Sequence, residues 1–180
     1  PKGAYRPEGV AVDSVMGIVQ AFELSLSDVH LLAGPYYHSA PNFFVAVNML
    51  MGATLVVQPK YDPIEALHLV DRHKITTIFM APTLLQRLCD VPEGVFSQYD
   101  MSSLRAIILG GAPCAYALKV RAIERFGERI WEFYGATETG FVTILRPEDQ
   151  LSKPNSCGQV GPGQEIRLLD TAGNEVPDTM

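Results

Sequence analysis

The sequence predicts an α/β fold in which helices flank a mostly parallel sheet. Two observations carry this prediction. Short apolar runs rich in β-branched residues alternate along the chain with helical stretches of about 10–15 residues, which is the pattern of crossover units. The composition, 47% hydrophobic and 19% charged, is that of a chain with a packed core. Because no repeat or linker divides it, we interpret residues 1–180 as a single subdomain, with about 158–180 beginning a β-rich segment.

The first part of the chain alternates helix and strand twice. Apolar side chains recur at helical spacing over residues 9–24, which predicts an amphipathic helix. The apolar run 28–34 then predicts a short buried strand. Residues 41–51 are apolar almost all round and predict a buried helix, and a second strand follows between Gly52 and Pro59.

The middle of the chain continues this alternation. Asp62 as N-cap and Pro63 at the first helical position indicate a helix over residues 61–73. Residues 74–82 are rich in β-branched side chains and predict a third strand. A short helix over 83–89 and a polar connection to about residue 103 follow.

The last part holds the strongest strand pattern. "LRAIILGGAP", residues 104–113, predicts a fourth strand that ends in a Gly-Gly turn. The next helix has one apolar face, formed by Ala115, Leu118, Ala122 and Phe126. Residues 129–135 predict a fifth strand, and residues 164–176 a sixth that ends in a hairpin-like turn at 172–174.

Composition and charge exclude several classes of function. A formal net charge of −6 leaves no basic excess to neutralise the phosphates of a nucleic acid. No apolar run is long enough for a transmembrane segment. The cysteines are three, far apart and without metal-like spacing, which favours a reducing cytoplasm over a disulfide framework: Cys89, Cys114 and Cys157.

Three loops are expected to meet at one edge of the sheet, because ligands of parallel sheets gather beyond the carboxyl ends of the strands. They are "GPYYHSAP", "GGAPCA" and "YGATETG". In the third, which follows the end of a strand, backbone N–H groups are expected to be free. Thr137 can donate to a phosphate oxygen, Glu138 is an oxygen ligand suited to Mg²⁺, and the rings of Phe133 and Tyr134 can stack on a base. A glycine-rich turn with solvated side chains is the alternative.

The other two loops leave more alternatives open. "GGAPCA" offers a backbone path close enough to bond a purine edge, or is only a strand-to-helix turn. Cys114, at the start of a helix, suggests a nucleophile with a lowered pKa, although no histidine partner is legible. His38 suits a pocket wall, a gate or a general base, or is an ordinary buried histidine. Lys2, in "PKG", suits the end of a phosphate loop.

Together these segments resemble the adenylate-forming enzymes, which include acyl-CoA synthetases, aryl-CoA ligases, luciferases and the adenylation domains of peptide synthetases. The resemblance covers essentially the whole chain. It rests on five segments in the same order as in that family: "PKGA", "PYYHSA", "LRAIILGGAP", "WEFYGATETG" and "SCGQVGPGQEIRLLD". The fourth contains the family's most specific motif, aromatic-Gly-x-Thr-Glu.

The resemblance implies a two-step reaction with ATP/AMP, Mg²⁺ and coenzyme A. A carboxylate attacks the α-phosphate of ATP to give an acyl-adenylate and pyrophosphate, and a thiol such as CoA then takes the acyl group. Thr137 would hold phosphate, Glu138 would bind Mg²⁺, and His38 would border the acyl pocket. The other implied residues are Lys2 in the phosphate loop, Gly111, Ala112, Pro113 and Tyr134 around adenine, and Gly135 near the reacting carboxylate.

Departures from the family pattern limit what is expected of the isolated chain. The turn "QVGPGQE" is shorter than usual, and both ends resemble cuts within the family's large N-terminal domain. We therefore expect the isolated chain to be inactive and to self-associate through exposed apolar surface. For the parent, a fatty or other apolar acid is the leading substrate. An aryl-CoA ligase, another adenylation domain and a non-catalytic nucleotide-binding module are the alternatives.

Overall fold

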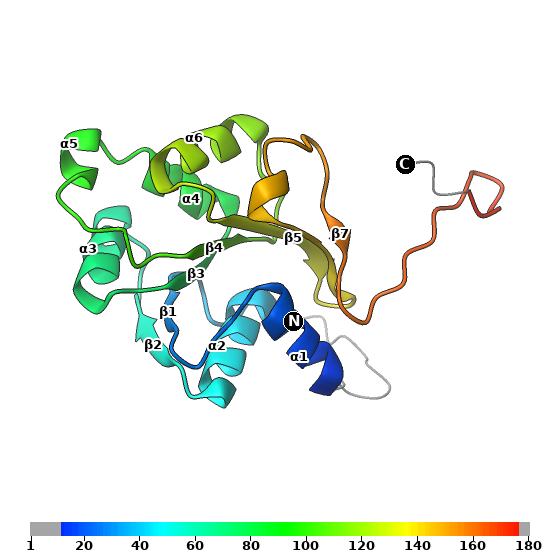
Figure 1. Ribbon diagram of the computed structural model, residues 1–180, viewed down its shortest axis with the longest axis horizontal. Helices are drawn as coiled ribbons and strands as arrows, with labels where there is room; N and C mark the ends of the chain where they lie inside the picture. Colours follow the sequence, from blue (N-terminus) through cyan, green and yellow to red (C-terminus); the bar gives the residue numbers. More distant parts are fainter. Residues whose placement is uncertain (1–11, 177–180) are drawn as a thin grey trace.

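The computed structural model describes residues 12–176, which form a seven-stranded sheet covered by helices on both faces (Figure 1). The strands are β1 (Val29–Leu32), β2 (Thr54–Val57), β3 (Thr77–Met80), β4 (Ala106–Leu109), β5 (Ile130–Ala136), β6 (Gly140–Leu145) and β7 (Gln159–Val160). The helices are α1 (Val12–Ala21), α2 (Ser39–Met51), α3 (Pro63–His73), α4 (Pro82–Cys89), α5 (Glu93–Phe96), α6 (Tyr116–Phe126) and the short 3₁₀ helix η1 (Pro147–Asp149).

The strand order is β2-β1-β3-β4-β5-β6-β7, and the first five strands in this order are parallel. β6 and β7 continue the sheet in antiparallel pairing. The predicted α/β class with a mostly parallel sheet is therefore confirmed. No helix within residues 12–176 combines the length and the apolar character needed to cross a membrane.

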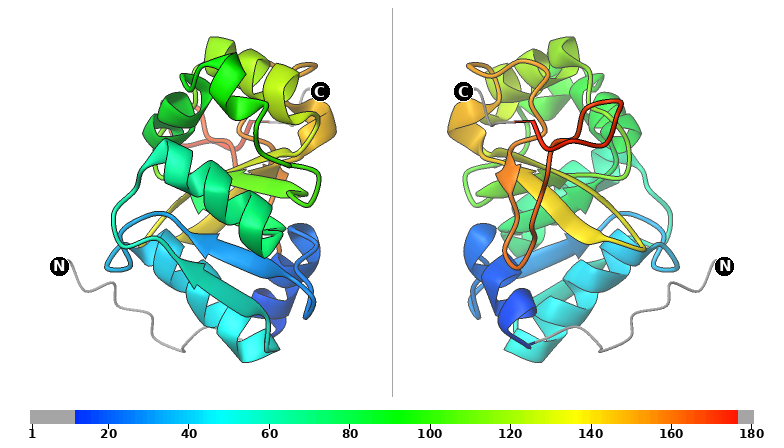
Figure 2. Two further views of the ribbon diagram at one scale, coloured as in Figure 1. Left: turned by 90° about the vertical axis from the view of Figure 1, so that its left-hand side faces the viewer. Right: turned by 90° about the vertical axis from the view of Figure 1, so that its right-hand side faces the viewer.

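Alternating side chains of the strands feed two separate cores, one on each face of the sheet. Ile107 and Ile130 face the layer of α3, α4 and α6, whereas Ile108 and Phe133 face the layer of α1 and α2. Figure 2 shows these two helical layers from both ends of the molecule. All four side chains are at least nine-tenths buried, as expected for strands covered on both faces.

Local signals place the helix ends where the sequence predicts them. The carboxylate of Asp62 accepts hydrogen bonds from the backbone N–H groups of Ile64 and Glu65, which caps α3. Helix α2 ends at its C-cap residue Gly52, which adopts a φ of +78°, a left-handed conformation that glycine reaches at little cost. Helix α5 is an addition, since the sequence analysis treated its residues as part of a polar connection.

The strands that follow β5 differ from those predicted from the sequence. β6 was not predicted, and the sixth strand predicted at 164–176 was wrong, because the structure has only an isolated bridge there, between Leu169 and Glu175. The expected turn is present, as the hydrogen bond from the N–H of Gly173 to the carbonyl of Asp170 shows. The apolar side chains of this segment are exposed, because no neighbouring strand covers them. The turn is therefore not followed by a regular pair of strands.

Helix α1 packs against segments that come much later in the chain. Phe22, just beyond its end, is fully buried and makes edge contacts with the rings of Trp131 and Phe133. Gly17 lies so close to Pro162 that a methyl group added at this glycine would come within 2.5 Å of the proline Cβ. The first helix is thereby fixed against β5 and against the segment that follows β7.

Candidate functional site

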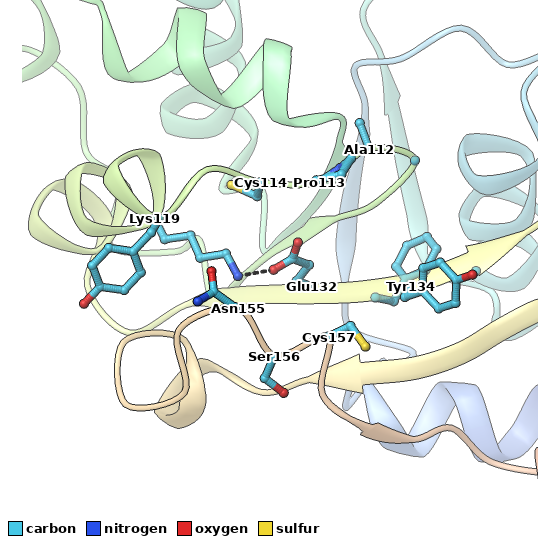
Figure 3. Close-up of a pocket in the computed structure, with 13 residues that line it drawn as sticks. Ala112, Pro113, Cys114, Lys119, Glu132, Tyr134, Asn155, Ser156 and Cys157 are labelled. Carbon is cyan, nitrogen blue, oxygen red and sulfur yellow. Dashed lines mark ion pairs between the residues drawn. The ribbon is translucent and has the colours of Figure 1, made fainter. Parts of the chain in front are cut away.

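Two neighbouring cavities open near the carboxyl ends of β4 and β5. The first cavity, of about 480 Å³, lies between the loop after β4 and the loop that precedes β7, with β5 along its floor (Figure 3). Its lining residues are Gly111, Ala112, Pro113, Cys114, Tyr116, Lys119, Glu132, Phe133, Tyr134, Gly135, Asn155, Ser156 and Cys157.

The second cavity, of about 390 Å³, lies between the start of α2 and the hairpin that joins β5 to β6. Its lining residues are Ser39, Ala40, Phe43, Gly111, Phe133, Gly135, Ala136, Thr137, Glu138, Gly140 and Phe141. The two cavities share Gly111, Phe133 and Gly135. They therefore adjoin, and one extended molecule can occupy both.

The end of β4 brings bare backbone to the boundary between the cavities. A methyl group added at Gly110 would lie 2.4 Å from the ring of Phe133, so only glycine leaves room for this ring. Gly111 adopts a φ of +83°, and a methyl group there would meet no atom within 4 Å. The open space beside Gly111 lets a ligand approach the main chain closely, as the sequence analysis expected of this loop.

The stretch "YGATETG" is the tip of a hairpin. β5 continues through Ala136, which pairs with Gly140, and the N–H of Ala136 donates to Thr139 Oγ1 at 3.1 Å. The stretch was expected to follow the end of a strand and to have free backbone N–H groups. For Ala136 this expectation was wrong, because Ala136 belongs to β5 and its N–H group is hydrogen-bonded. A methyl group at Gly135 would lie 2.0 Å from the carbonyl oxygen of Gly140, so the hairpin closes tightly here.

The structure brings together most of the residues that the sequence analysis singled out. The first cavity contains Gly111, Ala112, Pro113 and Tyr134, which were predicted to surround adenine, and Gly135, which was predicted to lie near the reacting carboxylate. The second contains Thr137 and Glu138, together with Ser39 from the loop and helix that follow β1. All three predicted loops thus contribute to these cavities, the loop after β1 through Ser39 and Ala40, as the rule for parallel sheets requires.

One predicted residue, His38, does not line these cavities. His38 is exposed, is the N-cap residue of α2, and packs its ring 4.7 Å from that of Tyr37. It is next to Ser39 in the chain but does not line either cavity. Lys2 lies outside the described residues.

The Glu138 carboxylate suits a hard cation whose other ligands come from a bound phosphate and from water. Glu138 is exposed at the hairpin tip, and residues 12–176 contain no cluster of three or more His, Cys, Asp or Glu side chains arranged to hold a metal. Mg²⁺ usually binds through one or two carboxylates plus substrate phosphates and water. Glu138 therefore fits Mg²⁺ held jointly with a phosphorylated ligand.

Two parts of the first cavity were not among the site residues predicted from the sequence. One is the buried ion pair between Lys119 and Glu132. The other is the loop of Asn155, Ser156 and Cys157, held in place by a 2.5 Å hydrogen bond from the Thr143 hydroxyl to the Cys157 carbonyl. A charged residue within a buried strand was a legible signal for Glu132, because such a charge requires a partner.

Cys114 does not have the environment of an activated nucleophile. Burial, reinforced by the charge of Glu132, raises the pKa of its thiol to about 11. The suggestion of a lowered pKa was wrong because Cys114 precedes the helix, whose N-cap is Ala115, and faces a carboxylate. A cysteine-dependent reaction at this position is therefore disfavoured.

Comparisons with known proteins agree with this arrangement. The profile of the AMP-binding enzyme family matches residues 1–180. Feruloyl-CoA synthase from Amycolatopsis sp is 29% identical over 179 residues, covering 98% of this chain and 36% of that protein. The amide bond synthetase McbA from Marinactinospora thermotolerans matches with a TM-score of 0.82 at 25% identity, over 91% of this chain and 33% of that one. O-succinylbenzoate coenzyme A synthetase from Bacillus subtilis, in complex with AMP, matches with a TM-score of 0.75 at 26% identity, again over 91% and 33%. This chain spans about a third of the length of each.

Proposed function

Because this chain belongs to the AMP-binding enzyme family, we propose that its parent protein is an acid–thiol ligase. It activates a carboxylic acid with ATP as an acyl-adenylate and passes the acyl group to coenzyme A. The 180 residues hold part of the site, and we expect the chain alone to be inactive. Three free cysteines support a cytoplasmic location for the parent.

One observation carries the proposal: two adjoining cavities share Gly111, Phe133 and Gly135. A nucleotide and an acid must meet at the α-phosphate, so a base site and an acyl site have to touch. The first cavity suits the adenine, between the loop of Gly111, Ala112 and Pro113 and the ring of Tyr134. The second suits the phosphate and the reacting carboxylate, close to Gly135.

Thr137 and Glu138 would assist the first step by position and charge. The Thr137 hydroxyl donates a hydrogen bond to a phosphate oxygen and keeps the α-phosphate in line with the incoming carboxylate. Glu138 would hold Mg²⁺, which would neutralise charge that develops on the phosphate oxygens. The carboxylate oxygen forms a bond to the α-phosphorus as the bond to pyrophosphate breaks.

The acid would enter from the side of α2. Ala40, Phe43 and Phe141 give the second cavity an apolar wall, which favours an acid with an apolar body. A fatty acid satisfies this wall and an aryl acid does so equally well, as the similarity to a feruloyl-CoA synthase suggests. His38, one residue before this cavity, would border the acyl entrance, and Lys2 would contribute to the phosphate loop.

The test is pyrophosphate release by the full-length parent with ATP, Mg²⁺ and a panel of acetate, fatty acids, benzoates and cinnamates. We expect release to depend on one class of acid and to fall roughly a hundredfold or more in Glu138→Ala, in line with the loss of a single charge-stabilising group. Glu128→Ala, which removes an exposed carboxylate remote from both cavities, is the matched control. ATP binding without release for any acid would instead identify a non-catalytic nucleotide-binding module.

A further inference from the structure

Helix α2 has an apolar face that is turned away from the sheet and exposed. Phe44 and Val47 of this helix are buried in the core beneath it. Ala46, Met49 and Leu50 are exposed, and their spacing places them on one stripe of the helix, which we call the α2 outer face. Met49 is 64% exposed and Leu50 is 84% exposed. Such exposure is unusual for two large apolar side chains that are neighbours.

Strand β2 continues this surface. It is the last strand at its end of the sheet, and among the described strands it pairs only with β1. Val56 packs against the core on the side of α3, so Val57, which is 58% exposed, points to the side of α2. Because α2 packs against β2, an open strand edge and an apolar helix face lie side by side (Figure 2).

This surface lacks the charges that a solvent-facing helix normally carries. From Ser39 to Gln58 the sequence contains no Asp, Glu, Lys, Arg or His. A helix that is apolar all round is generally buried, and a contiguous exposed apolar patch generally marks a surface that another body covers. Helices that lie on membranes carry Lys or Arg beside their apolar face, so a lipid surface is disfavoured. An apolar protein segment is the better match.

We propose that the part of the parent that precedes residue 1 packs on the α2 outer face and on β2. This chain spans about a third of the length of its relatives, so a parent of their length has ample chain to cover this surface. α1 lies in the same layer as α2, whereas the described C-terminal segment runs past β7, at the opposite edge of the sheet from β2 (Figure 1). The preceding part therefore joins this chain on the side of the uncovered surface.

The proposed contact concerns the assembly of the parent and does not depend on its reaction. It does affect the candidate site, because Ser39 and Ala40 at the start of α2 line the second cavity. A segment that covers the outer face of this helix would also hold one wall of that cavity in place.

Thiol labelling tests this assignment. Leu50→Cys and the control Arg72→Cys, at an exposed position of α3 in the opposite helical layer, are made in the 180-residue chain and in the full-length parent. Modification of the new cysteine by a maleimide in dilute solution is followed by peptide mass spectrometry. We expect the two sites to react at similar rates in the chain, whereas in the parent Leu50→Cys should react roughly tenfold more slowly than Arg72→Cys, or more slowly still.

Equal labelling of the two sites in the parent would overturn the proposal. Protection that disappears when the parent is diluted would also overturn it, because a second copy would then be the occupant. Leu50→Lys gives an independent measurement. It should lower the thermal midpoint of the parent, where the added charge is buried without a partner, and leave that of the chain nearly unchanged. A midpoint that falls equally in both proteins would contradict the proposal, because Leu50 would then act only within α2.

Discussion

The hydroxyl of Ser39, the first residue of α2, lies 3.0 Å from the hydroxyl of Thr137 at the tip of the β5–β6 hairpin. This hydrogen bond joins the two elements that form opposite walls of the second cavity. It connects a helix that follows the first strand with a hairpin that follows the fifth. The position of the Thr137 hydroxyl therefore depends on a residue far away in the sequence.

Removing the Ser39 hydroxyl should weaken the use of ATP more than it weakens the fold. A single hydrogen bond of this kind contributes about 1 kcal/mol, so we expect Ser39→Ala in the parent to raise the KM for ATP roughly fivefold with little change in the thermal midpoint. Steady-state kinetics with ATP as the varied substrate checks this. Ser27→Ala, at an exposed serine before β1, is the control. A KM that falls would mean that Ser39 competes with phosphate for Thr137.

Gly110 has no room for a side chain, so the fold should be sensitive to a single methyl group added at this position. In Gly110→Ala the new carbon would overlap the ring of Phe133, which is itself packed 4.5 Å from the ring of Phe141 and cannot withdraw. We expect unfolding free energy to fall by about 1–3 kcal/mol. Gly94→Ala, in α5 with no atom within 4 Å of the added carbon, should be neutral or stabilising by up to about 1 kcal/mol. Urea denaturation of the two variants measures both values, and equal losses would contradict the packing argument.

His30 should make the fold sensitive to mild acid. Burial lowers the pKa of this imidazole to about 4, against a partly opposing effect of the Asp28 charge. The unfolded chain therefore binds a proton between about pH 6.5 and 4 that the folded chain does not, and stability is present above this window and lost as pH falls through it. The loss is on the order of 3 kcal/mol for this group.

Denaturation curves across this pH range test the prediction. His30→Gln should flatten the fall in stability between pH 6.5 and about 4, whatever its effect at neutral pH. His73→Gln, at an exposed position on α3, should retain the wild-type slope. An unchanged slope in His30→Gln would show that other groups cause the acid sensitivity.

The three thiols should differ strongly in reactivity. Burial raises the pKa of both Cys89 and Cys114 to about 11, whereas Cys157 is exposed at the first cavity. Since the thiolate is the reacting species, we expect iodoacetamide at about pH 8 to modify Cys157 roughly ten times faster than the other two, or more. Peptide mass spectrometry over time measures this order, and faster labelling of Cys114 would restore the nucleophile hypothesis. Cys114→Ser in the parent should accordingly retain turnover.

Much of the fold was predictable because its strands are buried on both faces. A strand such as β4 is then a continuous apolar run, here ended by Gly110 and Gly111, and both its position and its role follow from composition. Placing the ligand edge at the carboxyl ends of these strands required only the rule for parallel sheets. Strand positions and this rule together are sufficient to group Gly111, Thr137 and Glu138 in one site.

The rest depends on pairing, which one stretch of sequence does not contain. The β-branched residues of β6 are typical of a strand, but the glycines of "YGATETG" indicate a loop as readily as the hairpin tip that they form. Residues 164–176 have a similar apolar character and remain outside the sheet, because no strand is available beside them. In the sequence, Lys119 and Glu132 are two unrelated charged residues. They form an ion pair only because α6 packs on β5.

The contact between Gly17 and Pro162 has a consequence for the order in which the protein matures on the ribosome. Helix α1 is synthesised first among the described elements, yet its partners Trp131, Phe133 and Pro162 emerge last. Until then α2 can cover part of the apolar face of α1, since Phe44 contacts Phe22, but the part that packs on β5 and on Pro162 stays exposed. Chains halted before β5 should therefore expose α1 to proteases, whereas chains released after residue 162 should protect it.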